Sequence, residues 1–438
     1  MITDEMEYER FSRQLYETGI LADPWIDGER RFSLRPLLIG ADRHGQLAGA
    51  AESIGAVMDE LARLVVRKPE LLDDFYGLTE WQKAMWSMSE GRWHGIARVD
   101  LFLCTDGRWR VCEVNSDTPS GEAEAVVANR MIWEQLPEQF SVQGEWHDPN
   151  RGMADRFWEM LVVSHTAASG PAASGAQRRP GRVGLIYPTD LPEDLSLVAL
   201  YRNWLTVRGC EVVTGSPYNL GLDGKGRVTL LGQPVDLVLR HYKTDWWGER
   251  QVVWRDQEPY ADPDPLEREL SILLPAELEG RVTVVNPFGS VITQNKHSLA
   301  LLWEYRSQFS AAAQQVIEDL IPETRRLVDI DPAALSQSDW VLKSVYGCEG
   351  DSVIVGPFVT PEIWKETLDK VVPEHWVAQR FFEVEPYRAG DSGDSDCDGW
   401  LPNYGLYLIA GRAAGLYTRL SREATDYRAV TMPSFVKK

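Results

Sequence analysis

The sequence predicts an α+β fold, because patterns typical of β-strands and patterns typical of α-helices both recur along it. Between residues 98 and 115, apolar and polar residues alternate with the period of two that indicates a β-hairpin. Residues 183–240 follow the order strand, helix, strand, and residues 282–438 mix strands with longer helices. At about 100–200 residues per domain, 438 residues are expected to form two to four structural units.

The chain divides into four predicted segments. Residues 1–163 hold amino-terminal helices and the hairpin, and apolar residues at helical spacing predict a long helix over 48–68. Residues 164–182, SHTAASGPAASGAQRRPGR, predict a flexible linker or loop. Residues 183–280 are expected to form a small α/β lobe. Residues 281–438 are expected to form a larger α+β lobe, of a size suited to binding a nucleotide. In the larger lobe we expect a strand over 282–286, a long helix over 297–320, a hairpin over 340–356, and strands over 376–382 and 404–420.

Charge and cysteine content exclude several classes of protein. The chain has 45 Lys and Arg against 66 Asp and Glu, and a net charge of −21 repels nucleic acid and anionic membranes. No uncharged apolar run approaches the roughly 18–20 residues that cross a bilayer, and the acidic start MITDEMEYERF does not match a secretory signal. The five cysteines lack C-x-x-C spacing and the seven histidines lack H-E-x-x-H spacing, so neither disulfides nor zinc is indicated. We expect a cytoplasmic protein of undetermined oligomeric state.

The hairpin suggests a metal site. If Asp106 and Gly107 are the two central turn residues, Asp100 lies opposite Glu113, Arg98 opposite Asn115, and Phe102 opposite Val111. Two carboxylates directly opposite each other repel, so a cation between them is favoured, with Asn115 as a neutral oxygen ligand. Oxygen ligands suit Mg²⁺, which takes its remaining ligands from water and substrate phosphates. A solvated face with spaced carboxylates explains the same pattern, and the hairpin alone favours that interpretation.

Two further stretches are candidates for phosphate binding. Lys343 lies in an apolar strand and is followed by the glycine-containing loop 347–352, whose amides and lysine are able to hold phosphate oxygens. Lys296 directly precedes a helix, where backbone amides favour an anion. The hydroxyl-rich turn 116–121 follows the hairpin, in a position where loops often bind ligands. An ordinary hairpin loop, helix start and turn are the alternatives at these three places.

An acidic loop resembles half of a calcium site. Asp394, Asp396 and Asp398, followed by Gly399, match the first half of an EF-hand loop, but its twelfth position is Gly405 rather than Glu. No flanking helices are evident, so a disordered acidic loop is the favoured interpretation. Whether residues 391–399 bind a cation stays open.

Four motifs together resemble a known family. In chain order they are R-V-D with E-V-N-S-D-T-P-S, V-N-P-F-G-S-V-I-T-Q-N-K-H-S-L-A-L-L-W-E, V-L-K-S-V-Y-G-C-E-G-D-S-V, and A-A-G-L-Y-T-R-L-S. The combination, from about residue 90 to the end, is similar to the synthetase part of the glutathionylspermidine synthase family. The resemblance implies a circularly permuted ATP-grasp fold with a pre-ATP-grasp-like lobe over 183–280. The amidase domain of that family has no counterpart here, so no hydrolytic activity is expected.

The resemblance also implies site residues and cofactors. ATP and Mg²⁺ are the expected cofactors, with Mg²⁺ held by Asp100, Glu113 and Asn115. Arg98, and with a less secure alignment Arg419, are the expected catalytic residues at the reacting phosphate. The remaining expected positions are Lys296, Lys343, Glu349, Gly350, Val377, Ala378 and Gln379 for ATP, with the last three on an edge strand, and Ser116, Thr118 and Ser120 for the acyl substrate.

The implied activity is an ATP-dependent ligation. In such a reaction a carboxylate is phosphorylated to an acyl phosphate and an amine displaces phosphate, giving an amide, ADP and phosphate. The expected partners are a small carboxylate and a small amine, drawn from amino acids, peptides or polyamines. Two alternatives remain: an ATP-grasp phosphotransferase that stops after phosphorylation, and a nucleotide-binding module without catalysis.

Overall fold

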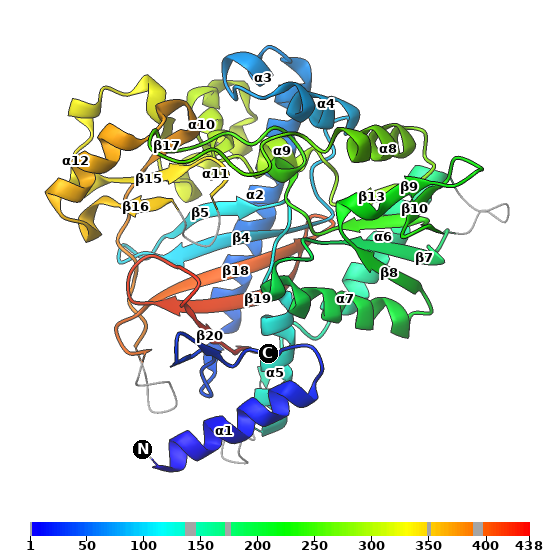
Figure 1. The fold of residues 1–438 in the computed structure, drawn as a ribbon. Coiled ribbons are helices and arrows are strands. Elements are labelled where there is room, and N and C mark those ends of the chain that lie inside the picture. The colour runs from blue at the N-terminus through cyan, green and yellow to red at the C-terminus, as the bar shows by residue number, and fades with distance from the viewer. Residues whose placement is uncertain (1, 136–145, 171–176, 348–351, 389–396) are drawn as a thin grey trace.

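The computed structural model describes residues 2–135, 146–170, 177–347, 352–388 and 397–438. Helices surround three larger sheets of five, four and four strands (Figure 1). The helices are α1 (Ile2–Glu17), α2 (Ala41–Arg67), α3 (Leu71–Asp74), α4 (Glu80–Met88), α5 (Glu122–Gln135), α6 (Met153–Ser169), α7 (Leu195–Val207), α8 (Glu267–Leu278), α9 (Ser290–Thr293), α10 (His297–Glu304), α11 (Ala311–Leu320) and α12 (Pro361–Lys370).

The five-stranded antiparallel sheet joins distant parts of the chain. Its order is β20-β19-β18-β4-β5, so the predicted hairpin pairs with strands that lie about three hundred residues later, through β18 and β4. Apolar side chains on one face, including Val99 and Leu101, pack against α2, which runs behind the sheet in Figure 1. The opposite face carries polar residues. The strands are β4 (Ile96–Leu103), β5 (Trp109–Asn115), β18 (Leu401–Ile409), β19 (Arg412–Ser421) and β20 (Val430–Met432).

The helix predicted over 48–68 begins earlier, at Ala41, and ends at Arg67. Its first residues, through Gln46, lie mostly in solvent, and the buried stripe starts only at Leu47. Apolar periodicity therefore revealed the packed part of α2 and missed its exposed first turns, because those turns have no core face.

The hairpin has the predicted pairing at the end that carries Arg98 and Asp100 and a different pairing near its turn. Arg98 lies opposite Asn115 and Asp100 opposite Glu113, as predicted. The turn is longer than a two-residue loop, since the Cys104 amide donates to the Arg108 carbonyl and Gly107 adopts a φ of 77°.

A β-bulge compensates for the longer turn. The register shifts after Asp100, so that Leu101 pairs with Val111 and Phe102 with Arg110, and the predicted pairing of Phe102 with Val111 is wrong. The bulge leaves Cys112 as the extra residue. The turn has one residue more than predicted, and the bulge shifts the register back by one residue. The pairs Arg98–Asn115 and Asp100–Glu113 therefore keep the predicted register.

The small α/β lobe contains a parallel sheet in the order β13-β12-β7-β8. Its fourth strand, β13, lies beyond the predicted boundary at residue 280, so the sheet of this lobe includes a strand that the sequence places in the larger lobe. The predicted linker over 164–182 also begins inside α6, where His165 is buried and its ring bonds to Thr283. Residues 171–176 lie outside the described residues. The strands are β7 (Arg182–Ile186), β8 (Glu211–Gly215), β12 (Leu237–Arg240) and β13 (Thr283–Val285).

The third sheet is antiparallel, in the order β14-β17-β15-β16, and α12 packs near it. The predicted hairpin over 340–356 forms its β15 and β16. The single helix predicted over 297–320 is wrong, because α10 ends at Glu304 and α11 starts after Ser310, whose hydroxyl accepts from the Ala313 amide as an N-cap. The strands are β14 (Thr324–Arg326), β15 (Trp340–Ser344), β16 (Val353–Val355) and β17 (Trp376–Arg380).

Smaller strands complete the fold. A parallel pair, β3 with β21, joins the amino-terminal region to the carboxyl terminus. Among the described residues, no helix is long and apolar enough to cross a membrane. The remaining strands are β1 (Trp25–Ile26), β2 (Glu29–Arg30), β3 (Leu37–Ile39), β6 (Trp146–His147), β9 (Leu220–Leu222), β10 (Val228–Leu230), β11 (Gln233–Pro234) and β21 (Ser434–Lys437).

Candidate functional site

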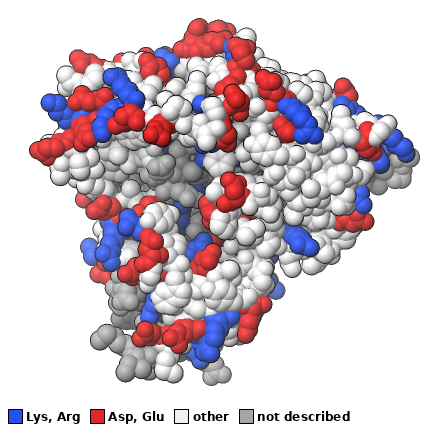
Figure 2. All heavy atoms as spheres, in the orientation of Figure 1, with Lys and Arg blue, Asp and Glu red and all other residues white. Residues whose placement is uncertain are grey.

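A large cavity of about 1190 Å³ lies where the three sheets meet. The polar face of the five-stranded sheet forms its floor, β15 to β17 form one end, and loops of the small α/β lobe form the other. On the face shown in Figure 2 the molecule is hollowed between the part that carries β16 and α12 and the strands below it. Cavities of this kind, with convergent charged groups, are the usual sites of small-molecule binding.

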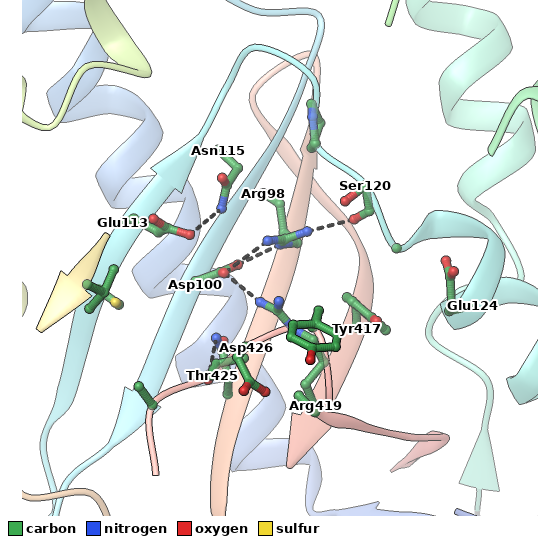
Figure 3. Close-up of a pocket in the computed structure, with 18 of the residues that line it drawn as sticks. Arg98, Asp100, Glu113, Asn115, Ser120, Glu124, Tyr417, Arg419, Thr425 and Asp426 are labelled. Carbon is green, nitrogen blue, oxygen red and sulfur yellow. Dashed lines mark hydrogen bonds and ion pairs between the residues drawn. The ribbon is translucent and has the colours of Figure 1, made fainter. Parts of the chain in front are cut away.

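Two arginines and one aspartate form the centre of the cavity floor (Figure 3). The Asp100 carboxylate accepts from Arg98 Nε at 2.6 Å and Nη2 at 3.0 Å, and from Arg419 Nη2 at 2.7 Å. Arg98 Nη1 also donates to the Ser120 carbonyl at 2.6 Å. Asp100 therefore fixes both guanidinium groups beside the loop that follows the hairpin, with charge-assisted hydrogen bonds.

The second carboxylate of the pair binds a lysine. Glu113 lies 3.3 Å from Lys296 Nζ and accepts from Asn115 Nδ2 at 3.1 Å. Lys296 Nζ also donates to the Gly347 carbonyl at 2.6 Å, which ties it to the start of the glycine-containing loop. Lys296 is almost fully buried and is not among the residues that line the cavity.

Both carboxylates are held in the charged form. Burial alone would raise the pKa of Asp100, but the charges of Arg98 and Arg419 outweigh it, so the pKa of Asp100 is lowered. Burial and the charge of Asp100 also oppose ionisation of Glu113, and Lys296 is the main group that nevertheless lowers its pKa. The mutual repulsion that suggested a cation is therefore offset by the protein's own cations in this structure.

The donor set fits Mg²⁺. Asp100, Glu113 and Asn115 present oxygen atoms from adjacent positions of β4 and β5 on the cavity side, and the two carboxylates are ionised. Oxygen donors of this kind, with positions left for water and phosphate, are what Mg²⁺ requires. Among the described residues, no cluster of three or more His, Cys, Asp or Glu side chains is placed to hold a metal ion, and this set has two carboxylates and one amide.

Lys343 lies at the end of the cavity formed by the third sheet. Its Nζ donates to Gln379 Oε1 at 2.7 Å and to the Cys112 carbonyl at 3.1 Å, with Cys112 Sγ at 3.0 Å. The bulged residue of the hairpin thus contacts the lysine of the third sheet. Lys343 and Gln379 both line the cavity.

The strand expected at the sheet edge is interior. β17 pairs with β14 on one side and β15 on the other, because β14 adds a strand that the sequence analysis did not predict. Gln379 of this strand lines the cavity, whereas Val377 and Ala378 are buried in the sheet and do not. The segment directly after β17 lines this end instead, with Phe381 and Phe382 among its residues. The aromatic pair in WVAQRFF was the available signal for it.

The loop after the hairpin has both structural and cavity-facing residues. Thr118 and Ser120 line the cavity, but Ser116 is fully buried and its hydroxyl bonds to Thr293 at 2.7 Å, so the structure does not place it at the site. The loop ends at Gly121, with a φ of 91°, where a Cβ would lie 2.4 Å from the Tyr417 ring. Only glycine fits that close approach.

Asp117 is a residue whose importance the sequence analysis missed. It is buried and bonds to Arg240 at 2.7 Å, to the Thr244 amide at 2.5 Å and to the Ser290 hydroxyl at 2.8 Å. Burial opposes its charge, but Arg240 lowers the pKa of Asp117. This network fixes the loop to the small α/β lobe, and its only sequence signal was an acid within a hydroxyl-rich turn.

The end of the cavity opposite β15 is built from elements that sequence reasoning did not assign to the site. The amino-terminal residues Asp23, Trp25 and Arg31 line it, and Arg31 forms an ion pair with Glu124 of α5. Loops of the small α/β lobe contribute Asp194 and His241. The expected ATP residues Glu349 and Gly350, and Asp394 and Asp396 of the acidic loop, lie outside the described residues.

Comparisons with known proteins agree with this architecture. Residues 39–437 match the family described as "Glutathionylspermidine synthase preATP-grasp", and no curated protein matches the chain. A glutathione synthetase-like effector from Globodera pallida, in its apo form, has a TM-score of 0.59 at 10% identity, over 98% of this chain and 96% of that chain. A putative gamma-glutamylcysteine synthetase from Methylobacillus flagellatus has a TM-score of 0.44 at 12% identity, over 86% and 88% of the respective chains.

The fold is that of the ATP-grasp ligases, as the sequence motifs predicted. The family match covers most of the chain, and the chain therefore belongs to the glutathionylspermidine synthase pre-ATP-grasp family. Its first 38 residues lie outside the matched range, although four of them, Asp23, Trp25, Ile26 and Arg31, line the cavity.

Proposed function

We propose that this protein is an ATP-dependent ligase that joins a small carboxylate to a small amine through an acyl phosphate. The observation that carries the proposal is the arrangement of one cavity with three kinds of surface. Lys343 and aromatic residues lie at one end, two arginines and two ionised carboxylates at the centre, and a separate polar end lies beyond the hydroxyl-rich loop. A single-substrate binding module would not need this division.

The nucleotide is assigned to the end formed by the third sheet. Phe381 and Phe382 supply flat apolar surface for a base, while Lys343 supplies a positive charge for phosphate oxygens. Lys296, held between Glu113 and the Gly347 carbonyl, lies where the glycine-containing loop begins. If Glu113 bound Mg²⁺, the Lys296 ammonium would be free to pair with a phosphate.

Phosphoryl transfer is assigned to the centre. A carboxylate of the substrate would lie beside Arg98, Thr118 and Ser120, and attack on the γ-phosphoryl group would give the acyl phosphate and ADP. Arg98 and Arg419 are fixed by Asp100 before substrate binds, so they stabilise the charge on the transferring oxygens without reorganising. Mg²⁺, held by Asp100, Glu113 and Asn115, would neutralise phosphate charge.

The test is ADP release from Mg·ATP in the presence of pooled substrates. One pool contains glutamate, γ-glutamylcysteine and glutathione, and the other contains ethanolamine, 1,4-diaminobutane and spermidine. ADP that requires both pools, with a product lighter by one water than its two precursors, is the expected result. Lys343→Ala should lose this activity, and Lys365→Ala on the exposed face of α12 is the matched control.

Other outcomes identify the alternatives. ADP release with one pool alone and a phosphorylated product would assign a phosphotransferase. Binding of ATP without turnover in any combination, at substrate concentrations well above the usual KM range, would assign a nucleotide-binding module.

A further inference from the structure

The small α/β lobe contains a binding position that the proposed nucleotide and transfer sites do not use. From β7 the chain proceeds to β8 on one side of the sheet and later returns to β12 on the other side, and all these strands are parallel. The strand order therefore reverses between β7 and β12. In open parallel sheets, ligands bind in the crevice outside the carboxyl ends of the strands at such a reversal.

A histidine and an aspartate occupy this position. His241 directly follows the end of β12, and its backbone amide donates to the Ile186 carbonyl at the end of β7. Asp194 lies at the start of α7, the helix that follows β7. His241 Nε2 is 2.9 Å from Asp194 Oδ1, the two side chains are 7% and 19% exposed, and both residues line the cavity.

The pair lies within electrostatic reach of the transfer centre. Glu122 starts α5 two residues after Ser120, and its buried carboxylate accepts from the Tyr201 hydroxyl at 3.1 Å. Burial raises the pKa of Glu122 to about 7, and the charges of His241 and Arg98 partly oppose that rise. Glu122 is therefore close enough to feel the charges of both His241 and Arg98, and Arg98 binds the Ser120 carbonyl.

We propose that His241, oriented by Asp194, is the base that removes a proton from the amine substrate before it attacks the acyl phosphate. This inference rests on the proposed ligase function. Among the described residues that line the cavity, His241 is the only histidine. An alkyl amine is mostly an ammonium ion at neutral pH and has no lone pair for attack, and histidine is the side chain that most often acts as a general base.

The step balances without a further reactant. One ammonium proton passes to the His241 imidazole, and the freed lone pair forms the C–N bond at the acyl carbon. The C–O bond to phosphate breaks and its electron pair leaves with the phosphate, which takes the second nitrogen proton. The products are the amide, hydrogen phosphate and an imidazolium ion, whose charge Asp194 stabilises.

Hydroxylamine, used in place of the amine substrate, distinguishes loss of the proposed proton transfer from loss of ATP binding or acyl phosphate formation. It is unprotonated at neutral pH and attacks acyl phosphates to give hydroxamates, so it needs no base. His241→Asn should lower amide formation from the carboxylate and amine pools described above by at least about a hundredfold. Hydroxamate formation from the same carboxylates should stay within about threefold of wild type, which also shows that the variant is folded and binds ATP.

Two further variants complete the experiment. Asp194→Asn should lower amide formation less than His241→Asn, because it alters the orientation of the ring and leaves the imidazole in place. His44→Asn, a half-buried histidine of α2 that does not line the cavity, is the matched control and should be unchanged in both assays.

The contrary outcomes are distinct. Equal loss of amide and hydroxamate in His241→Asn would overturn the proton-transfer role, as would unchanged amide formation. Wild-type protein that forms no hydroxamate with any carboxylate would overturn the ligase function itself, and the role of His241 with it.

Discussion

The substitution Asp100→Asn tests whether Asp100 stabilises the folded protein, in addition to its proposed role as a Mg²⁺ ligand. The wild-type carboxylate accepts three hydrogen bonds from Arg98 and Arg419, whose side chains are 6% and 13% exposed. Asparagine keeps the size but places an NH₂ donor against guanidinium donors and removes the negative charge. Loss of one partner from a buried ion pair costs about 3–5 kcal/mol, so the variant should unfold at a clearly lower denaturant concentration.

The assay is urea unfolding followed by tryptophan fluorescence, without nucleotide or metal. Asp106→Asn, on the exposed turn of the same hairpin, is the control and should change stability by less than about 0.5 kcal/mol. Combining Asp100→Asn with Arg419→Gln should cost less than the sum of the two single changes, by about 0.5–3 kcal/mol.

Because the folded-state pKa of Asp100 is lowered, its stabilising effect is present above the unfolded pKa of about 3.9 and is lost as the pH falls through the folded pKa. Equal unfolding midpoints for the two Asn variants at pH 7 would refute the reasoning.

Three other predictions concern nucleotide, metal and pH. Lys343→Ala should weaken binding of a non-hydrolysable ATP analogue by about 1.5–3 kcal/mol in calorimetry, and unchanged affinity would remove Lys343 from the nucleotide site. Glu113→Gln should raise the Mg²⁺ concentration for half-maximal ADP release by about tenfold, since a charged ligand is lost; an unaltered Mg²⁺ dependence would contradict the metal assignment. Burial raises the pKa of Glu122 to about 7, so its neutral form stabilises the fold below the unfolded pKa of about 4.3 and this stability is lost as the pH rises through 7. Glu122→Gln should therefore become increasingly more stable than wild type between pH 4 and pH 8, and a constant difference would exclude the raised pKa.

Local sequence patterns predicted the hairpin pairs that matter for the site. Arg98 with Asn115 and Asp100 with Glu113 followed from the turn position and the period of two, even though the turn length was wrong. That agreement depended on the bulge at Cys112, which a pattern of alternating residues does not reveal. The same bulge brings Cys112 to Lys343 of the third sheet, so it also positions part of the site.

Contacts between distant segments were beyond sequence reasoning. The ion pairs of Asp100 with Arg419 and of Glu113 with Lys296 join residues that are far apart in the chain, and each side chain by itself looked like a separate ligand. Ser116 resembled its neighbours Thr118 and Ser120 in type, but the strand end turns it into the interior. A hydroxyl pattern gives residue types, whereas the side of the loop that faces the cavity is decided by tertiary packing.

The two ends of the cavity differ in whether their residues lie inside the range that the family matches. The end assigned to ATP is built from β15, β17 and the segment after β17, all inside the matched range. The opposite end includes Asp23, Trp25 and Arg31, which precede that range, and Tyr8 anchors them through its hydroxyl bond to the Pro24 carbonyl at 2.5 Å. Tyr427, a lining residue from the loop after β19, donates to Asp27 of the amino-terminal region at 3.0 Å. The wall of the cavity farthest from the end assigned to ATP therefore lies partly outside the matched range, and we expect differences in substrate among proteins that share the fold to arise there.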